Sequence, residues 1–469
     1  WAESASWAVP ANATSGLYIA KLVRDDATPG ASHITFIVRD DDGNSDMLFQ
    51  TSDTTWQAYN GYGGYSLYAA PNHAHKVSYN RPFLTRSNST EDFWFNSEYP
   101  MIRWLERNGY DVSYFTDVDS HRNAAEILEH NIFLSIGHDE YWSAEQRAAV
   151  EAARDAGVHL AFFSGNSVYW KTRWENSTDG SNTPFRTLVS YKEGSLAGSE
   201  HYTCQGNNNC DPDPDTWTGL WRDGCSVAGH DGCNPENNLM GTISWMGNTD
   251  TIQVPEADGN MRFWRNTALA AASGTLEGNT LGYEWDHEQA LYADDYPDGR
   301  IWLSTTGSNG QTHHLSLYRA PSGALVLGAG TVQWMWGLDG NHDRGATTEN
   351  VDMQQATVNL FADMGVQPAT LQNNLVAASA STDSTNPTAA ITSPASGTNA
   401  PSGSPIIISG TAADSGGGVV GAVEISLDNG TTWTKATGRE AWTYTWIPST
   451  PGSTASIRVR AIDDSGNIG

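Results

Sequence analysis

The feature that most constrains the fold is a regular alternation of short apolar runs and amphipathic segments between residues 99 and 163. The runs 132–136 (IFLSI) and 159–163 (HLAFF) have the length and composition of buried strands. Between them, the capping box Ser143-Ala-Glu-Gln146 predicts the start of a helix, and Gly157 predicts its end. Strands that alternate with helices in this way predict a parallel sheet with helices on both faces.

Neighbouring segments extend the same pattern. We expect helices over 99–108, 122–129 and 353–364, and sheet strands over 33–39 and 110–116. A strand over 17–24 has no partner nearby in the sequence, and it is either the last strand of a preceding domain or an edge strand of the next one. Between about residues 185 and 338, short β-like runs, turns and insertions predominate. The predicted fold class is therefore α/β, with an open, mostly parallel sheet flanked by helices and carrying β-rich insertions.

The C-terminal part has a different pattern. Residues 373–388 are rich in Asn, Ala, Ser and Thr, which is a linker composition, and 389–469 contains short alternating strands separated by Gly, Pro and Asn turns. Asp428-Asn429-Gly430 is a hairpin-turn sequence. We predict an immunoglobulin-like β-sandwich without a cysteine pair. The predicted domains are an N-terminal strand or remnant of a preceding β-domain (1–32), the α/β domain (33–372), the linker (373–388) and the sandwich (389–469).

Charge excludes two classes of partner. The chain carries 25 Lys and Arg against 54 Asp and Glu, for a formal net charge of −29. Such a surface repels nucleic acid and anionic membranes, and it suits cation binding or simply solubility. No run of 18 apolar residues is present, so the sequence predicts no membrane insertion.

The cysteines predict an oxidising compartment. All four lie close together in a loop rich in Gly, Asn and Asp: Cys204, Cys210, Cys225 and Cys233. Their spacing lacks the short knuckles of structural zinc sites, so we predict two disulfides, with three pairings open, in an exposed insertion. This insertion is either a lid over the ligand-binding edge or surface decoration. Four glycosylation sequons agree with export: Asn12, Asn88, Asn176 and Asn429. The predicted location is extracellular, as a secreted or cell-surface protein.

Ligands of an open parallel sheet bind beyond the carboxyl ends of its strands. That rule selects three segments: 54–68, 137–143 and 164–170. The first is rich in Tyr, the second contains Gly137-His138-Asp139-Glu140-Tyr141-Trp142-Ser143, and the third contains Asn166 and Tyr169. None of them has the G-x-S-x-G pattern of a nucleophile elbow, and no cysteine is placed as a nucleophile.

Five ordered motifs carry a family resemblance over about residues 33–366. They are TWQAYN…GG.SLY, HDEYWS, GN..YW, LGYEWD at 281–286, and SGALV…GTVQWMWGLD. This set resembles the C-terminal domain family of the N,N-dimethylformamidase large (beta) subunit. The sheet with a strand-end Gly-His also resembles the glutamine-amidotransferase-like fold, and the last domain resembles bacterial Ig-like modules. The likeness to the glutamine-amidotransferase-like group is one of fold and says nothing about chemistry.

The resemblance implies hydrolysis of a small tertiary amide by one non-haem iron, held by two tyrosinates and a glutamate. For the metal we predict Tyr141 and Glu284, with Tyr59, Tyr99 and Tyr169 as competitors for the second tyrosinate position. The catalytic candidates are His138, Glu140 and Asn166. Calcium is a further candidate, at two acidic loops, 40–46 and 211–215, although solvated turns explain such loops equally well.

Together these features predict a secreted, metal-dependent hydrolase of C–N amide bonds that acts on a small-molecule or cell-surface amide. The alternative is a non-catalytic extracellular structural or binding protein that uses the α/β domain as a scaffold and self-assembles. Near-stoichiometric iron in the purified protein distinguishes the two.

Overall fold

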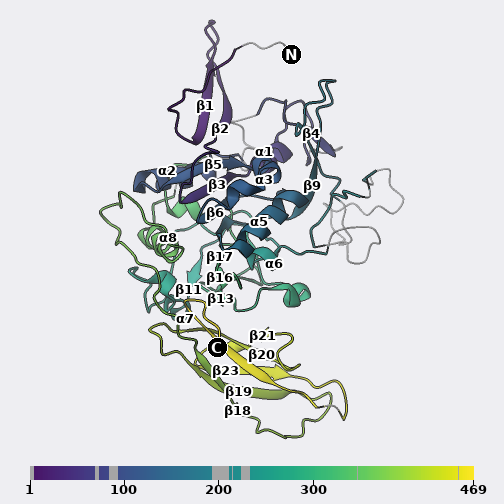
Figure 1. Ribbon diagram of the computed structural model, residues 1–469, viewed down its shortest axis with the longest axis vertical. Helices are drawn as coiled ribbons and strands as arrows, with labels where there is room; N and C mark the ends of the chain where they lie inside the picture. Colours follow the sequence, from purple (N-terminus) through teal and green to yellow (C-terminus); the bar gives the residue numbers. More distant parts are fainter. Residues whose placement is uncertain are drawn as a thin grey trace.

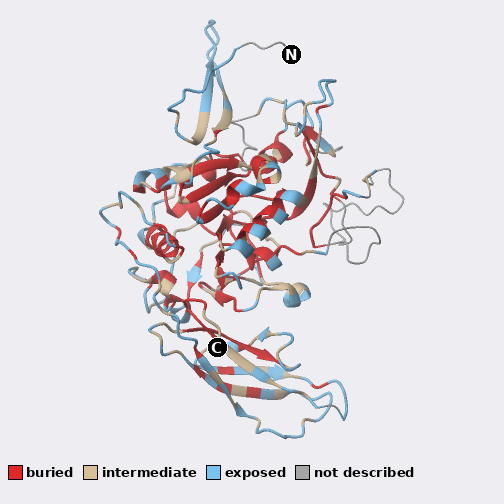
Figure 2. Ribbon diagram, viewed as in Figure 1, coloured by how far each residue is buried: buried red, intermediate tan, exposed pale blue. Residues whose placement is uncertain are grey.

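The computed structural model describes residues 5–68, 73–83, 93–192, 211–213, 215–222, 233–345, 347–452 and 454–469. Along its long axis, a projecting β-hairpin, a mixed α/β body and a C-terminal β-domain follow one another (Figure 1). Buried residues concentrate in the body, whereas the hairpin is mostly exposed (Figure 2).

A seven-stranded sheet forms the centre of the body, in the order β13-β16-β17-β8-β6-β3-β5. Its strands are β3 (Met47–Thr51), β5 (Val112–Thr116), β6 (Ile132–Gly137), β8 (His159–Ser164), β13 (Ile301–Trp302), β16 (Ser316–Arg319) and β17 (Leu325–Gly328). The five strands from β17 to β5 run parallel, and β16 and β13 add antiparallel pairs at one edge. The α/β class is confirmed.

Helices cover both faces of this sheet because successive strand residues point to opposite sides. Leu48, Phe133 and Phe162 pack with α5 (Ala144–Ala156). The next residues along the same strands, such as Phe49 and Leu134, pack with α2 (Glu98–Asn108) and α8 (Val351–Asp363). The Ser143 capping box and the left-handed Gly157 that bound α5 are as the sequence predicts.

Shorter elements complete the body. The helices are α1 (Asp53–Tyr59), α3 (Asp117–Arg122), α4 (Ala124–Ile127), α6 (Asn237–Met240) and α7 (Glu256–Gly259), with 3₁₀ turns η1 (Arg262–Trp264), η2 (Ala290–Asp295) and η3 (Trp334–Gly337). A second sheet, in the order β4-β10-β9-β7, contains β4 (Lys76–Ser78), β7 (Tyr141–Ser143), β9 (Trp170–Glu175) and β10 (Thr187–Val189). Two small ribbons pair β11 (Gln253–Val254) with β12 (Gly274–Thr275), and β14 (Thr306–Ser308) with β15 (Gln311–His313).

Two predictions near the N-terminus are wrong. Strand β1 (Gly16–Val23) does have a partner nearby, because it pairs along its whole length with β2 (Ala31–Val38). The run 33–39 therefore belongs to a hairpin, and its place in the central sheet is taken by β3. Every residue of β3 is buried, whereas β2 is mostly exposed or half-buried. The centre of a parallel sheet demands burial on both faces, and the short run MLFQT meets that demand better than the longer run HITFIVR.

The C-terminal domain is an antiparallel sandwich, as predicted. One sheet has the order β18-β19-β23-β22 and the other β21-β20-β24. Their strands are β18 (Thr388–Ser393), β19 (Ile406–Ala413), β20 (Val420–Ser426), β21 (Thr434–Lys435), β22 (Thr437–Gly438), β23 (Ala441–Trp446) and β24 (Arg458–Asp463). Asn429 and Gly430 have φ values of 68° and 95°, which suit the predicted turn after β20.

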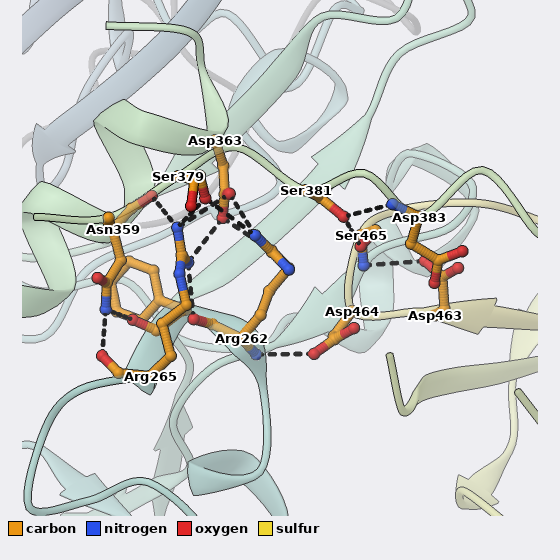
Figure 3. Close-up of polar contacts among 12 residues, drawn as sticks. Arg262, Arg265, Asn359, Asp363, Ser379, Ser381, Asp383, Asp463, Asp464 and Ser465 are labelled. Carbon is orange, nitrogen blue, oxygen red and sulfur yellow. Dashed lines mark hydrogen bonds and ion pairs between the residues drawn. The ribbon is translucent and has the colours of Figure 1, made fainter. Parts of the chain in front are cut away.

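This domain packs directly on the body. Ala422 of β20 and Ile462 of β24 belong to the same hydrophobic cluster as the central sheet. Gly421 lies so close to Ile301 that an added Cβ would approach its Cγ2 to 2.7 Å. The backbone N–H of Arg262 donates to Asp464 at 2.8 Å (Figure 3).

Among the described residues, no helix combines the length and apolarity of a membrane span.

Candidate active site

Three elements bring the candidate residues to the carboxyl edge of the sheet. Helix α1 follows β3 and ends at Tyr59, His138 and Glu140 follow β6, and Asn166 follows β8. Because β3, β6 and β8 are parallel neighbours, their carboxyl ends meet at one edge. This edge is where the sequence predicts ligand binding.

Glu140 is the centre of the site. Its side chain is almost wholly buried, with 2% of its surface exposed. Two phenol hydroxyls donate to it, one on each oxygen: Tyr68 to Oε1 at 2.7 Å and Tyr59 to Oε2 at 3.1 Å. The two tyrosine rings stack with their centroids 4.2 Å apart. One carboxylate and two phenols thus present their oxygen atoms to one another within a buried space.

A second group of side chains joins Glu140 to Glu284. The Nε2 atom of His138 lies 3.3 Å from Glu140 Oε2 and 2.8 Å from Glu284 Oε2. The Nδ2 atom of Asn166 donates to Glu284 Oε2 at 2.8 Å. The Glu284 side chain is 16% exposed, so it is the member of this group that lies nearest to solvent.

A strained turn after β8 positions Asn166. Its φ of 48° lies in the left-handed region, and its backbone N–H donates to Asp286 Oδ1 at 2.8 Å. Gly165 lets the segment that carries Glu284 approach, because an added Cβ would lie 3.0 Å from the Glu284 carbonyl oxygen and 2.9 Å from Thr331 Cα. The GN..YW motif therefore requires glycine at position 165 because a side chain there would clash with the neighbouring backbone.

The buried position of the site favours the protonated, neutral forms of its acidic side chains. Burial raises the pKa of Glu140 to about 7, against a lowering effect of His138, and Glu284 raises it further. Burial, then the charge of Glu140, raises the pKa of Tyr68 well above its usual value. Burial also raises the pKa of Asp286 to about 7. The Nζ atom of Lys192 lies 2.9 Å from the centroid of the Tyr68 ring, so a cation adjoins the phenol.

The structure brings together Tyr59, His138, Glu140, Asn166 and Glu284 from the predicted set. Tyr141 is fully buried beside them, with its ring 6.4 Å from that of Tyr68. Tyr99 lies elsewhere, since it belongs to an aromatic cluster with Trp94 and Phe95 at ring distances of 5.4 and 5.9 Å.

Tyr169, the third competitor for the second tyrosinate position, is buried against Trp170 at a ring distance of 5.0 Å.

Other predictions fall partly outside the described residues. Of the four cysteines only Cys233 is described, where it is exposed, so the two disulfides and the lid stay predictions. Neither acidic loop gathers three potential metal ligands in the described part of the chain. In the loop 211–215, the Asp211 carboxylate instead forms an ion pair with Arg173 at 2.5 Å.

The sequence analysis did not single out Tyr68 and Lys192. Tyr68 lies in the first motif of the resemblance, nine positions after Tyr59, and the requirement for two tyrosinates was the feature that could have identified the pair. Lys192 has no such pattern. It is buried, with a φ of 51°, and only the fold reveals its neighbours.

The architecture of a mixed α/β body and a C-terminal sandwich agrees with the comparisons. The family described as N,N-dimethylformamidase beta subunit-like, C-terminal, matches residues 1–349, and the bacterial Ig domain family matches 387–461. The chain belongs to the N,N-dimethylformamidase beta subunit-like, C-terminal family and also contains a bacterial Ig domain. No curated protein matches it.

Proposed function

We propose that this protein is an iron-dependent amidohydrolase that acts on non-peptide C–N amide bonds outside the cell. The observation that carries the proposal is the convergence of the Tyr59 and Tyr68 hydroxyls on the buried carboxylate of Glu140. Family membership supports the same class of reaction.

The donor set fits a ferric ion. Ferric iron is a hard cation that favours anionic oxygen ligands, and two phenols and one carboxylate supply them. We assign Tyr59, Tyr68 and Glu140 as the residues that would hold it. Glu284 and Tyr141, the first choices from sequence, then become neighbours of the metal position. When bound, the ion would supply a Lewis acid that polarises the amide carbonyl.

The protein's own side chains perform the proton transfers. Glu284 reaches both the site and solvent, so it accepts a proton from the attacking water as general base. The water oxygen bonds to the carbonyl carbon, the C–N bond breaks, and Glu284 returns the proton to the departing amine. His138, between the two carboxylates, holds Glu284 in place with a charge-assisted hydrogen bond. The Asn166 amide is a neutral donor that fixes the same oxygen.

The expected surroundings bear on the substrate. Bacterial Ig modules and the predicted disulfide-bearing insertion are typical of exported proteins. Such a protein meets small amides in the medium and amides of the cell surface, and we propose these as the substrate class. The two disulfides and the sequon glycans belong to the same proposal.

The test is metal analysis of the purified protein and of three variants: Glu140→Gln, Tyr59→Phe and Tyr68→Phe. Tyr99→Phe is the matched control, because it removes a hydroxyl from a tyrosine outside the site. We expect near-stoichiometric iron with a visible tyrosinate-to-iron absorption in the parent and in the control. Each site variant should lose most of the iron, together with turnover of a panel of simple amides.

Absence of iron or another transition metal at near-stoichiometric level in the parent protein would overturn the proposal. An equal loss of bound iron in Tyr59→Phe and Tyr99→Phe would contradict the assignment of the metal ligands. Stoichiometric iron with no turnover of any amide would favour the non-catalytic alternative.

A further inference from the structure

Three carboxylates face one another where the linker meets the C-terminal domain. Asp383 comes from the linker, Asp414 from the loop after β19, and Asp463 from the end of β24. Each offers one oxygen atom, and these oxygen atoms all lie within 4.8 Å of one another. Figure 3 shows the carboxylates of Asp383 and Asp463 side by side.

Two of these three carboxylates each have one oxygen atom that is buried without a donor. Asp383 Oδ2 and Asp414 Oδ1 are shielded from solvent, and neither accepts a hydrogen bond from the described part of the chain. Buried polar atoms are almost always hydrogen-bonded, and a buried carboxylate oxygen without any partner is especially unfavourable. Two such atoms from different segments, within one acidic group, indicate a missing positive partner.

The neighbouring arginines do not fill that role. Arg262 and Arg265 both pair with Asp363, at 2.6 and 2.9 Å. Arg319 donates from Nε to the Ser465 carbonyl at 3.1 Å. In the described chain, no ion pair within 4.0 Å joins a cationic side chain to Asp383, Asp414 or Asp463, so three formal negative charges remain uncompensated there.

The other oxygen atoms of the group are held by donors nearby. Asp383 Oδ1 accepts from the N–H of Thr385 at 2.9 Å, and Asp414 Oδ2 accepts from the N–H of Gly418 at 3.1 Å. Asp463 accepts the N–H of Asn467 at 2.8 Å. These bonds orient the carboxylates before any ligand arrives, which reduces the entropy lost on binding.

A glycine-rich loop lets the carboxylates approach one another. An added Cβ at Gly416 would lie 1.9 Å from Asp383 Oδ1. At Gly418 it would lie 2.4 Å from Asp464 Oδ1 and 3.2 Å from Asp383 Oδ2. The loop 415–418 therefore has to lack side chains at these positions for the group to assemble.

We propose that Asp383, Asp414 and Asp463 form a calcium site that ties the linker to the C-terminal domain. Calcium binds oxygen ligands at about 2.3–2.6 Å, so two oxygen atoms on one ion lie at most about 5 Å apart. The observed spacing meets that limit. Water completes the shell, which calcium tolerates because its coordination is irregular and flexible.

Bound calcium would fix the position of the linker on the α/β body. Ser381, two residues before Asp383, shares a hydrogen bond with Ser465 at 2.7 Å, and Asp464 accepts the N–H of Arg262 (Figure 3). The ion would join the linker to the loop after β19 and to the end of β24, directly before the residues that make these contacts. Loss of calcium should therefore loosen the junction between the two domains before it affects either core.

The test uses the full chain, freed of metal with a chelator and titrated with calcium chloride at constant ionic strength. We expect one equivalent of bound calcium by calorimetry and a rise in melting temperature of about 5 °C at a hundredfold excess over Kd. Calcium should also slow proteolytic cleavage between residues 379 and 387.

The variants are Asp414→Asn and Asp383→Asn, with Glu440→Gln as the matched control, because Glu440 is an exposed carboxylate of the same domain. Both site variants should lose at least tenfold in calcium affinity while remaining as stable as the chelated parent. The control should bind like the parent. Absence of binding by the parent, or unchanged binding and thermal shift in both site variants, would overturn the proposal.

Discussion

At the carboxyl edge of the sheet, most buried carboxyl groups of the described chain lack an arginine or lysine in ion-pair contact. Asp119, which pairs with Arg39 and Arg122, is different. At the junction with the C-terminal domain, by contrast, several carboxylates outside the proposed calcium site meet guanidinium groups. Asp363 pairs with two arginines, Asp258 with Arg439 at 2.7 Å, and Glu424 with Arg460 at 2.6 Å. In the described chain, five buried carboxyl groups at the edge have no such partner: Asp53, Glu98, Asp117, Asp139 and Glu140.

This difference shows how a chain with a net charge of −29 uses its few cations. Arginine pairs near the junction neutralise charge permanently, and the pair of Arg439 with Asp258 joins the two domains. At the sheet edge, protons and polar side chains satisfy the carboxyl groups, so a metal ion or a substrate can replace those protons. The absence of an arginine or lysine partner at these five carboxyl groups is thus what leaves them chemically responsive.

The largest expected effect comes from breaking the compensated region. Asp363→Ala removes the shared partner of Arg262 and Arg265 and leaves two guanidinium groups in a mostly buried junction. We expect a loss of about 3–5 kcal/mol in the free energy of unfolding, because an unpaired buried charge is strongly unfavourable. Denaturant unfolding measures it. Asp26→Ala, in the exposed pair with Arg24, is the control and should leave the stability unchanged; an equal loss in both would contradict the comparison.

The uncompensated region should respond to pH instead. Burial raises the pKa of Asp53 from 3.8 to about 7, and burial raises the pKa of Glu98 from 4.5 to about 8. The folded state then binds protons more tightly than the unfolded chain, so this contribution is fully present near pH 4 and is lost as pH rises to about 8. Urea unfolding at pH 5 and pH 8 should show lower stability at pH 8.

Asp53→Asn tests that assignment, because an amide keeps the shape of the side chain and does not titrate. We expect its stability loss between pH 5 and pH 8 to be smaller than that of the parent by about 2 kcal/mol. Asp155→Asn, at a mostly exposed carboxylate, should reproduce the parent slope. A slope in Asp53→Asn equal to that of the parent would show that other groups control the pH response.

Two glycines allow a matched comparison of the regions. Gly165→Ala at the sheet edge and Gly421→Ala at the junction each introduce a Cβ within 3.0 Å of neighbouring atoms. Both should destabilise by about 1–3 kcal/mol through overpacking. Only Gly165→Ala should also lower amide turnover by at least tenfold in the folded protein, because it displaces the backbone of Glu284. An equal loss of turnover in both variants would show that general destabilisation causes the loss.

Local sequence patterns predicted the parts of the fold that local physics decides. The strands at 132–136 and 159–163, the capping box at Ser143 and the turn at Asn429 depend on neighbours within a few residues. The site was predicted as a region, since the carboxyl ends of parallel strands must meet. The choice of Glu140 over Glu284 as the partner of the tyrosines depends on how β6, α1 and a distant loop converge, which no spacing encodes.

The strand at 33–39 shows the opposite limit. Its β-propensity is high, but it forms a strand in a local hairpin and not in the central sheet. The shorter β3 occupies the central position because it can be buried on both faces. The junction arginines had no sequence pattern at all. Arg262 and Asp363 are 101 positions apart, and their pairing follows from the docking of η1 against α8.

The smallest expected effect concerns Lys435, a half-buried lysine at the junction. Lys435 lies with Nζ 4.6 Å from the centroid of the Trp302 ring and donates to the Arg300 carbonyl. Burial, then the charge of Arg300, lowers its pKa from 10.5 to about 7. The unfolded chain therefore binds more protons between pH 7 and pH 10.5, so stability from this group rises with pH across that window.

Lys435→Met keeps the aliphatic contact with Trp302 and removes the titration. We expect it to gain about 1 kcal/mol at pH 7 and to lose the rise above pH 7, both measured by urea unfolding at pH 7 and pH 9. Lys76→Met, at an exposed lysine outside the junction, should keep the parent profile. A rise in Lys435→Met as steep as in the parent would show that the junction holds its lysine charged and paired, as it holds its arginines.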